Sequence, residues 1–115
     1  MKAEPVSQAP SNVRLLAALG ICKKAGGLLC GTPMICDALA GNKKPLLVLT
    51  ASDNSENTDK RLRDKCAFYG VERLKIDIDG GALAHAVGKS SKLSAVAVTD
   101  SNLCRLVKGA IQAQR

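Results

Sequence analysis

The sequence has few of the residues that bind metals or carry out acid–base catalysis. It contains a single histidine, His85, and its five cysteines form no Cys-x-x-Cys pair. The sequence therefore offers almost no set of ligands for a zinc site. Phosphate-binding loops, dinucleotide fingerprints and nucleophile elbows are missing too, because the glycines at Gly26, Gly27 and Gly31 lack the required spacing and the following Lys-Ser or Lys-Thr. We therefore expect no cofactor, no metal and no enzymatic activity.

Long apolar runs are also missing. Residues 46–49 form a typical apolar stretch, far short of the ~18 to 20 residues that span a bilayer. Residues 15–22 resemble the core of a secretory signal, but the directly following Lys23 and Lys24 favour a buried helix. At 115 residues and 46% hydrophobic, the chain is too apolar for disorder and long enough for one core. These values predict a single soluble domain without membrane contact.

The remaining candidates for chemistry are His85 and the cysteines. His85 lies on a short predicted helix between two alanines, where a surface or half-buried side chain is the simpler interpretation. The odd number of cysteines, in a chain that needs no cross-links, predicts reduced thiols and a cytoplasmic location. We interpret these thiols as small buried hydrophobic side chains; they are Cys22, Cys30, Cys36, Cys66 and Cys104.

The formal net charge of +7 is unevenly distributed along the chain. Residues 1–51 carry six basic and two acidic side chains, residues 52–79 carry six and seven, and residues 80–115 carry five and one. Basic flanks of this kind are typical of proteins that bind nucleic acid, because each Lys or Arg near a phosphate releases condensed counterions. A merely solvated basic surface is the alternative.

Hydrophobic periodicity predicts alternating helices and strands after a polar, proline-containing lead. We expect a disordered tail over residues 1–10 and one domain over residues 11–115. The spacing predicts helices over residues 11–25, 33–40, 59–69, 80–87 and 101–111, and strands over residues 28–30, 46–50, 74–78 and 94–99. The second helix is expected to have Thr32 as its N-cap. This order predicts an α/β fold, a three-layer α/β/α sandwich with a central, mostly covered sheet of about four strands.

Two glycine-bounded loops carry the candidate binding residues. Residues 26–32 lead into a helix N-terminus, where free N–H groups favour an anion, and residues 88–92 supply two cations and two hydroxyls. Loops of this kind can emerge at a common edge of a sandwich, giving a surface suited to an RNA backbone. The predicted RNA-binding residues are Lys23, Lys24, Gly31, Thr32, Lys43, Gly88, Lys89, Ser90, Ser91 and Lys92, with Lys23 and Lys43 adding general attraction.

Several motifs, over roughly residues 13–111, resemble the ribosomal protein L-seven-Ae/L-thirty-e family, and within it the bacterial YlxQ branch. They are Leu-x-x-Cys-x-Lys-Ala-Gly at residues 19–26, Asp-Asn-Ser-Glu-Asn-Thr at 53–58, Asp-Lys-Cys at 64–66, Phe-Tyr-Gly-Val at 68–71, and the segment 83–89, where Ala84 replaces a family glycine. The resemblance implies a non-catalytic, monomeric α/β/α protein that binds kink-turn or other structured RNA, such as ribosomal RNA, in the translation apparatus. Its RNA contacts would come from the two loops named above.

The resemblance fails at one motif. Kink-turn readers carry Gly-x-Asn-Glu-x-x-Lys at the start of the second helix, whereas residues 31–37 read Gly-Thr-Pro-Met-Ile-Cys-Asp. Pro33 and Met34 cannot replace the hydrogen-bonding groups of Asn and Glu, and Asp37 reverses the charge of the Lys. Contact with RNA backbone is still expected. The apolar Pro33-Met34-Ile35 edge also permits the alternative function of a protein-interaction module on the same fold.

The expectation of reduced thiols gives a first prediction. Cys30 and Cys36 are close enough in sequence to form a disulfide, but a domain of this size does not need one. Thiol labelling under denaturing, non-reducing conditions should count five thiols per chain. A count of three would reveal a disulfide and overturn the cytoplasmic assignment.

Overall fold

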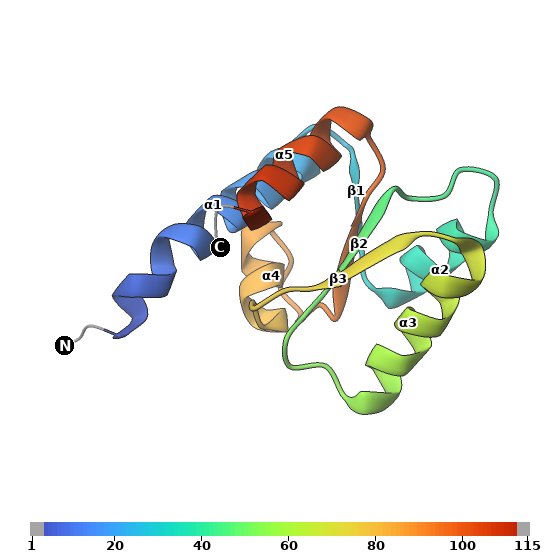
Figure 1. Cartoon of the computed structure of the whole chain (residues 1–115), viewed down its shortest axis with the longest axis horizontal. Coiled ribbons are helices and arrows are strands. Elements are labelled where there is room, and N and C mark those ends of the chain that lie inside the picture. The colour runs from blue at the N-terminus through green and yellow to red at the C-terminus, as the bar shows by residue number, and fades with distance from the viewer. Residues whose placement is uncertain (1–3, 113–115) are drawn as a thin grey trace.

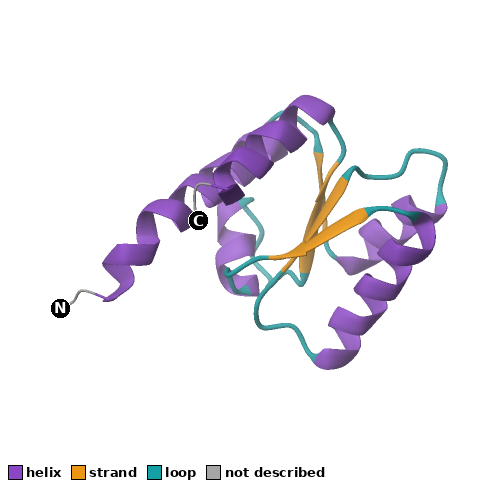
Figure 2. Cartoon of the chain, viewed as in Figure 1, coloured by secondary structure: helices purple, strands orange, loops and turns teal. Residues whose placement is uncertain are grey.

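The protein forms a three-layer α/β/α sandwich, seen here in a computed structural model that describes residues 4–112 (Figure 1). A four-stranded sheet lies between α1, α4 and α5 on one face and α2 and α3 on the other (Figure 2). This confirms the predicted fold class. The elements are α1 (Glu4–Lys24), β1 (Leu28–Cys30), α2 (Thr32–Ala40), β2 (Leu47–Thr50), α3 (Glu56–Tyr69), β3 (Glu72–Lys75), α4 (Gly80–Ala86), β4 (Ala95–Val98) and α5 (Ser101–Gln112).

The sheet is mixed, with the strand order β1-β4-β2-β3. Strand β4 pairs antiparallel with both β1 and β2, while β2 and β3 are parallel. The C-terminal ends of β1, β2 and β3 therefore meet the N-terminal end of β4 at one edge of the sheet. We call this the carboxyl edge; it contains Gly31, Ala51, Ile76 and Ser94, the residues directly next to those strand ends. The opposite edge is the amino edge.

The two central strands, β2 and β4, are buried on both faces, which explains why their sequences are apolar without alternation. Successive side chains point to opposite faces, so Val48, Ala95 and Ala97 pack with α2 and α3. The intervening residues of the same strands, Leu47, Leu49, Val96 and Val98, pack with α1, α4 and α5. No helix in the described part of the chain has both the length and the hydropathy of a membrane span.

Three helix starts differ from the expected ones. Helix α1 begins at Glu4 instead of Ser11, so the predicted tail is helical from Glu4 onward, and residues 1–3 lie outside the described residues. The N-cap of α2 is Gly31, with φ +95°, and not Thr32, whose hydroxyl is bonded elsewhere. Helix α3 starts at Glu56 because the Ser55 hydroxyl accepts a hydrogen bond from the Thr58 N–H and caps it there.

The third strand also starts earlier than expected, at Glu72, and its ladder ends at Lys75. The predicted alternation nevertheless identified buried side chains, because Ile76 and Ile78 lie in the core just beyond the strand. The Ile76 N–H donates to the Thr50 carbonyl (3.0 Å), and the Ile78 carbonyl accepts from the Ser52 N–H (2.9 Å). The chain thus stays hydrogen-bonded to the end of β2 after regular pairing has ended.

Two glycines offer a matched test of packing at the carboxyl edge. A Cβ at Gly80 would lie 2.6 Å from the Leu93 carbonyl oxygen, whereas a Cβ at Gly109 in α5 would meet nothing within 4 Å. Gly80→Ala should therefore lower the free energy of unfolding by about 1 to 3 kcal/mol through overpacking. Gly109→Ala should raise it by about 0.5 to 1 kcal/mol through helix propensity. Urea unfolding measures both, and equal effects would contradict the close packing of Gly80.

Candidate nucleic-acid interface

The carboxyl edge brings the end of β1 and the start of α2 into contact with the residues that lead into β4, whereas Gly27, in the same predicted loop, lies at the amino edge. The Gly31 N–H donates to the Ala95 carbonyl (3.0 Å), and the hydroxyls of Thr32 and Ser94 are hydrogen-bonded to each other. Both contacts follow from the antiparallel pairing of β1 with β4, which places the end of one strand beside the start of the other. The start of α2 and the loop before β4 therefore form one continuous surface.

The loop before β4 is fixed at both of its ends. Gly88, with φ +75°, lets the chain turn out of α4, and the Lys89 N–H then donates back to the Ala84 carbonyl (2.8 Å). At the other end, the Leu93 N–H donates to the Gly80 carbonyl (3.1 Å). The residues between these points are exposed: Lys89, Ser90, Ser91 and Lys92. Their ammonium and hydroxyl groups are thus presented from a short loop with fixed ends.

The segment Asp53-Asn54-Ser55 holds this loop in place. Asn54 Nδ2 donates to the Ser94 carbonyl (2.9 Å), which also accepts from the Ala51 N–H (2.9 Å). Asp53 Oδ1 accepts from the Gly80 N–H (2.9 Å) at the start of α4. In the sequence this segment served only as a mark of family resemblance, and its structural role was missed. Adjacent Asx residues between a buried strand and a capped helix were the available signal.

Lys89 and Lys92 differ in their surroundings. Lys92 Nζ lies 3.1 Å from Asp53 Oδ2, so part of its charge is already compensated. Lys89 has no ion pair within the described residues. Burial raises the pKa of the Cys30 thiol above its ordinary 9.0, and the ammonium groups of Lys23 and then Lys89 oppose that rise. The charges of both lysines therefore act on the same thiol, at the C-terminal residue of β1.

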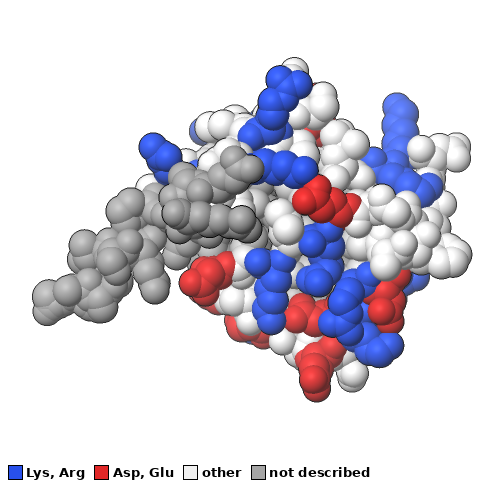
Figure 3. Space-filling view, in the orientation of Figure 1, with Lys and Arg blue, Asp and Glu red and all other residues white. Residues whose placement is uncertain are grey.

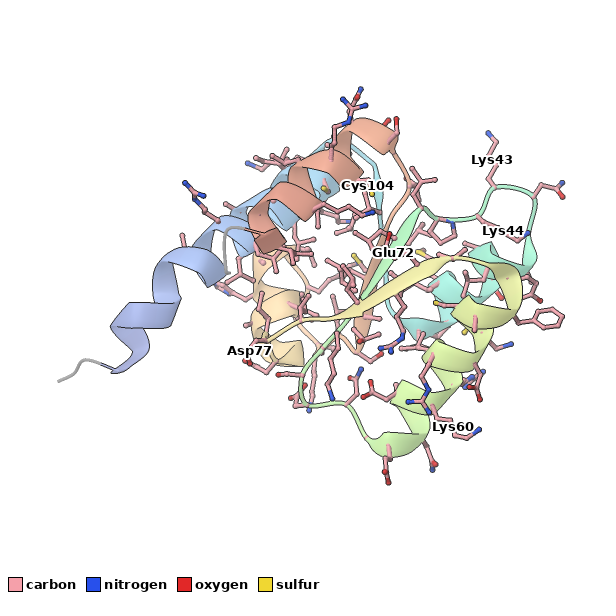
Figure 4. The ribbon with its side chains drawn as sticks, in the orientation of Figure 1. Lys43, Lys44, Lys60, Glu72, Asp77 and Cys104 are labelled. Carbon is pink, nitrogen blue, oxygen red and sulfur yellow. The ribbon has the colours of Figure 1, made fainter. Side chains whose placement is uncertain are left out.

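Two of the predicted cations lie elsewhere. Lys43 is on the loop after α2, and the nine residues of that helix separate it from Gly31 by roughly 13 Å (Figure 4). Lys24 ends α1 at the amino edge, where the Thr99 N–H donates to the Gly27 carbonyl (3.0 Å). No hydrogen bond or ion pair between residues 4 and 112 connects Lys24 or Lys43 with the carboxyl edge.

The start of α2 offers backbone groups in place of the side chains of the kink-turn signature. No side chain caps this helix, and because Pro33 has no N–H, the Thr32 and Met34 N–H groups are those of its first turn that lack an intrahelical partner. Pro33 and Met34 are both exposed, Met34 by 54%, and Asp37 is exposed one turn later. The first turn can therefore bind a phosphate or hydroxyl oxygen through its backbone, with an apolar rim beside it. His85 is exposed on α4, and the described residues contain no cluster of His, Cys, Asp and Glu side chains that could hold a metal ion.

No protein-family model matches the chain, but two curated proteins do. The RNA-binding protein YlxQ of Bacillus subtilis (strain 168) is 33% identical over 82 residues, which cover 71% of this chain and 79% of that protein. The RNA-binding protein YlxQ of Enterococcus faecium is 27% identical over 94 residues, covering 82% of this chain and 87% of that protein.

Solved structures with the same fold include a protein of unknown function from Bacillus halodurans C. It matches with a TM-score of 0.75 and 27% identity, over 86% of this chain and 97% of that one. The Giardia lamblia 15.5kD RNA binding protein matches with a TM-score of 0.70 over 92% of this chain and 91% of that one. At 18% identity, the second match supports the fold alone.

The contacts of Asp53 predict a dependence of stability on pH. The Gly80 N–H and then Lys92 hold the pKa of the Asp53 carboxyl below its ordinary 3.8. Its contribution to stability is therefore complete above about pH 4 and is lost as the pH falls through the lower pKa of the folded state. Asp53→Asn should lower stability at pH 7 and flatten the loss of stability below pH 4. In urea unfolding at stepped pH, the exposed Asp77→Asn serves as control, and identical pH profiles for the two variants would contradict this role (Figure 4).

Proposed function

Because the chain belongs to the YlxQ group of the ribosomal protein L-seven-Ae/L-thirty-e family, we propose that it is a non-catalytic RNA-binding protein whose interface is the carboxyl edge. The observation that carries this proposal is the junction at Ser94, where the start of α2 and the basic loop of residues 88–92 become one surface. Its ligand is structured RNA, with kink-turn-like RNA of the translation apparatus as the leading class. The protein acts as a cytoplasmic monomer.

The chemistry of the edge favours contact with the RNA backbone over reading of base edges. Lys23 and Lys89 offer ammonium groups to phosphates, and Ser90 and Ser91 offer hydroxyls to phosphate or ribose oxygens. Lys92 can join them once it leaves Asp53, an exposed ion pair that costs little to break. Since Pro33 and Met34 stand where amide and carboxylate groups would read bases, selectivity comes from RNA shape.

A protein-interaction module is the second candidate. Met34 is 54% exposed next to the exposed Pro33, and a partner protein could cover this apolar rim. Substituting Met34 separates the two functions, because the RNA backbone contacts proposed above do not use its side chain. Met34→Ala should leave the dissociation constant for a kink-turn hairpin RNA within about twofold, measured by fluorescence anisotropy, since a side chain outside the contacts contributes little. A weakening of tenfold or more would show that the rim itself contacts RNA.

Two double variants, matched in charge, test the location of the interface. Lys89→Ala/Lys92→Ala removes two cations and the ion pair with Asp53, and Arg105→Ala/Lys108→Ala removes two cations and the ion pair between Lys108 and Glu72 (2.6 Å). The loop variant should flatten the dependence of log K on log salt by about 0.7 to 0.9 for each phosphate that is no longer neutralised, because cations at the backbone release counterions. The α5 variant should change it little, since distant charges are screened within about 8 to 10 Å.

Gel shifts with structured RNA at several salt concentrations measure these slopes, and duplex DNA is the control ligand. Equal weakening in the two variants would show that binding follows net charge alone. A stronger effect of the α5 variant would place the RNA on another face. Equal affinity for duplex DNA and structured RNA would overturn the proposed function itself.

A further inference from the structure

The chain's only two aromatic side chains lie next to each other at the C-terminal end of α3. The ring centroids of Phe68 and Tyr69 are 4.8 Å apart, and the rings are perpendicular. Tyr69 is half-buried against the core between the sheet and α2/α3, whereas Phe68 is 80% exposed, more than any other large hydrophobic side chain described. The core thus anchors Tyr69, and Tyr69 supports a phenyl ring that the fold does not bury.

One basic side chain lies over the neighbouring Tyr69 ring. Lys44 Nζ lies 5.3 Å from the centroid of the Tyr69 ring, and it donates to the Gly41 carbonyl (2.9 Å), which fixes the loop that also carries Lys43. Figure 4 shows both lysines on this loop, and Figure 3, in the same orientation, shows Lys and Arg side chains on that side of the molecule. We call Phe68, Lys43 and Lys44 the aromatic platform.

Helix α3 adds further positive charge on the side of Phe68. Arg61 and Lys65 precede Phe68 by seven and three residues, which places all three on one face of the helix. An acidic residue, Asp64, lies one turn before Phe68, but it is paired with Lys60 at 2.9 Å. The surroundings of the exposed ring are therefore basic along the helix as well as at the loop.

We propose that the aromatic platform is a second RNA contact, at which one unpaired base stacks on Phe68 while Lys43 and Lys44 bind the flanking phosphates. This inference rests on the proposed function and extends it to single-stranded RNA. Every base has a π-face, so stacking on an exposed phenyl ring requires no particular sequence. A single base is accommodated because Lys44 already lies at the Tyr69 ring and leaves Phe68 as the available stacking surface. The basic surroundings favour a polyanion over an uncharged apolar partner.

Helix α3 connects the aromatic platform with the carboxyl edge. Its first turn is fixed by the Ser55 cap and by Asp59, which accepts from Asn54. Its last turn ends at Gly70 in a left-handed conformation. A helix fixed at both ends sets the distance between the two contacts, and the RNA, not the protein, must adapt to it.

The distance between the platform and the carboxyl edge determines the design of the RNA probes. Helix α3 has 14 residues, so its C-terminal end lies about 20 Å from the carboxyl edge, where the helix begins. An RNA bound at the carboxyl edge reaches the platform only if a strand continues past its structured part. The probes are therefore a blunt kink-turn hairpin and the same hairpin with a single-stranded extension of about eight nucleotides.

The test compares the affinities of the full chain for these two RNAs. The wild-type protein should bind the extended hairpin more tightly, and Phe68→Ala should remove that gain, about five- to a hundredfold, while leaving the affinity for the blunt hairpin unchanged. Phe68→Tyr should retain the gain. Phe68→Leu is the matched control, because it keeps an apolar side chain and removes the ring. Since Phe68 is exposed, these variants should unfold at the wild-type temperature.

A tryptophan at this position gives a direct readout, because the chain contains none. The fluorescence of Phe68→Trp should be quenched by the extended hairpin and by the extension oligonucleotide alone, but not by the blunt hairpin. An unquenched signal, or a gain in affinity that persists in Phe68→Ala or in Phe68→Leu, would overturn base stacking. A response to an acidic peptide without a response to RNA would identify a protein contact instead and also overturn it.

The outcomes also separate this inference from the proposed function. If the stacking test at the platform is negative but binding of the blunt hairpin still weakens in Lys89→Ala/Lys92→Ala, the carboxyl edge is the RNA contact and the platform is not a second one. If the wild-type chain does not bind the blunt hairpin at all, the proposed function fails. In that case, quenching of Phe68→Trp fluorescence by the extension oligonucleotide still shows whether a base stacks at the platform.

Discussion

The geometry of the carboxyl edge depends on the hydrogen bonds that converge on Ser94. Its carbonyl accepts from the Ala51 N–H at the end of β2 and from the Asn54 side chain before α3, and its hydroxyl is bonded to Thr32 at the start of α2. Ser94 thereby joins its own segment before β4 to two others that are far away in sequence, the start of α2 and residues 51–54. The carbonyl would be costly to leave without donors, which gives the junction a single low-energy arrangement.

This junction explains how the short loop of residues 88–92, which carries two lysines, is held in one position. The ion pair of Lys92 with Asp53 is exposed and contributes little to stability, so the loop is fixed mainly by backbone hydrogen bonds and by the close approach of Gly80 to Leu93. The lysine side chains remain free to move to a phosphate. A rigid backbone with mobile cations suits contact with an RNA backbone, where position matters more than a fixed donor geometry.

The element types, the fold class and most of the buried side chains could be predicted without the structure. The apolar run of β2 and the alternation of Ile76 and Ile78 with polar residues predict burial correctly. They do so because the hydrophobic free energy of each side chain depends on its own apolar surface area. The two loops were identified as candidate contacts in the same way, from their own glycines, lysines and hydroxyls. Lys43 was placed among them only through its charge, which carries no information about distance.

The strand order, the geometry of the two proposed contact surfaces and several element ends depend on partners distant in sequence. Thr32 was a reasonable N-cap by local preference, but its hydroxyl is bonded to Ser94, 62 residues away, and Gly31 takes the cap position instead. The pairing of Tyr69 with Lys44 is equally invisible in the sequence. The physical reason is the same in both cases: hydrogen bonds and ring contacts depend on partners that lie far apart in the sequence and come together only in the folded structure.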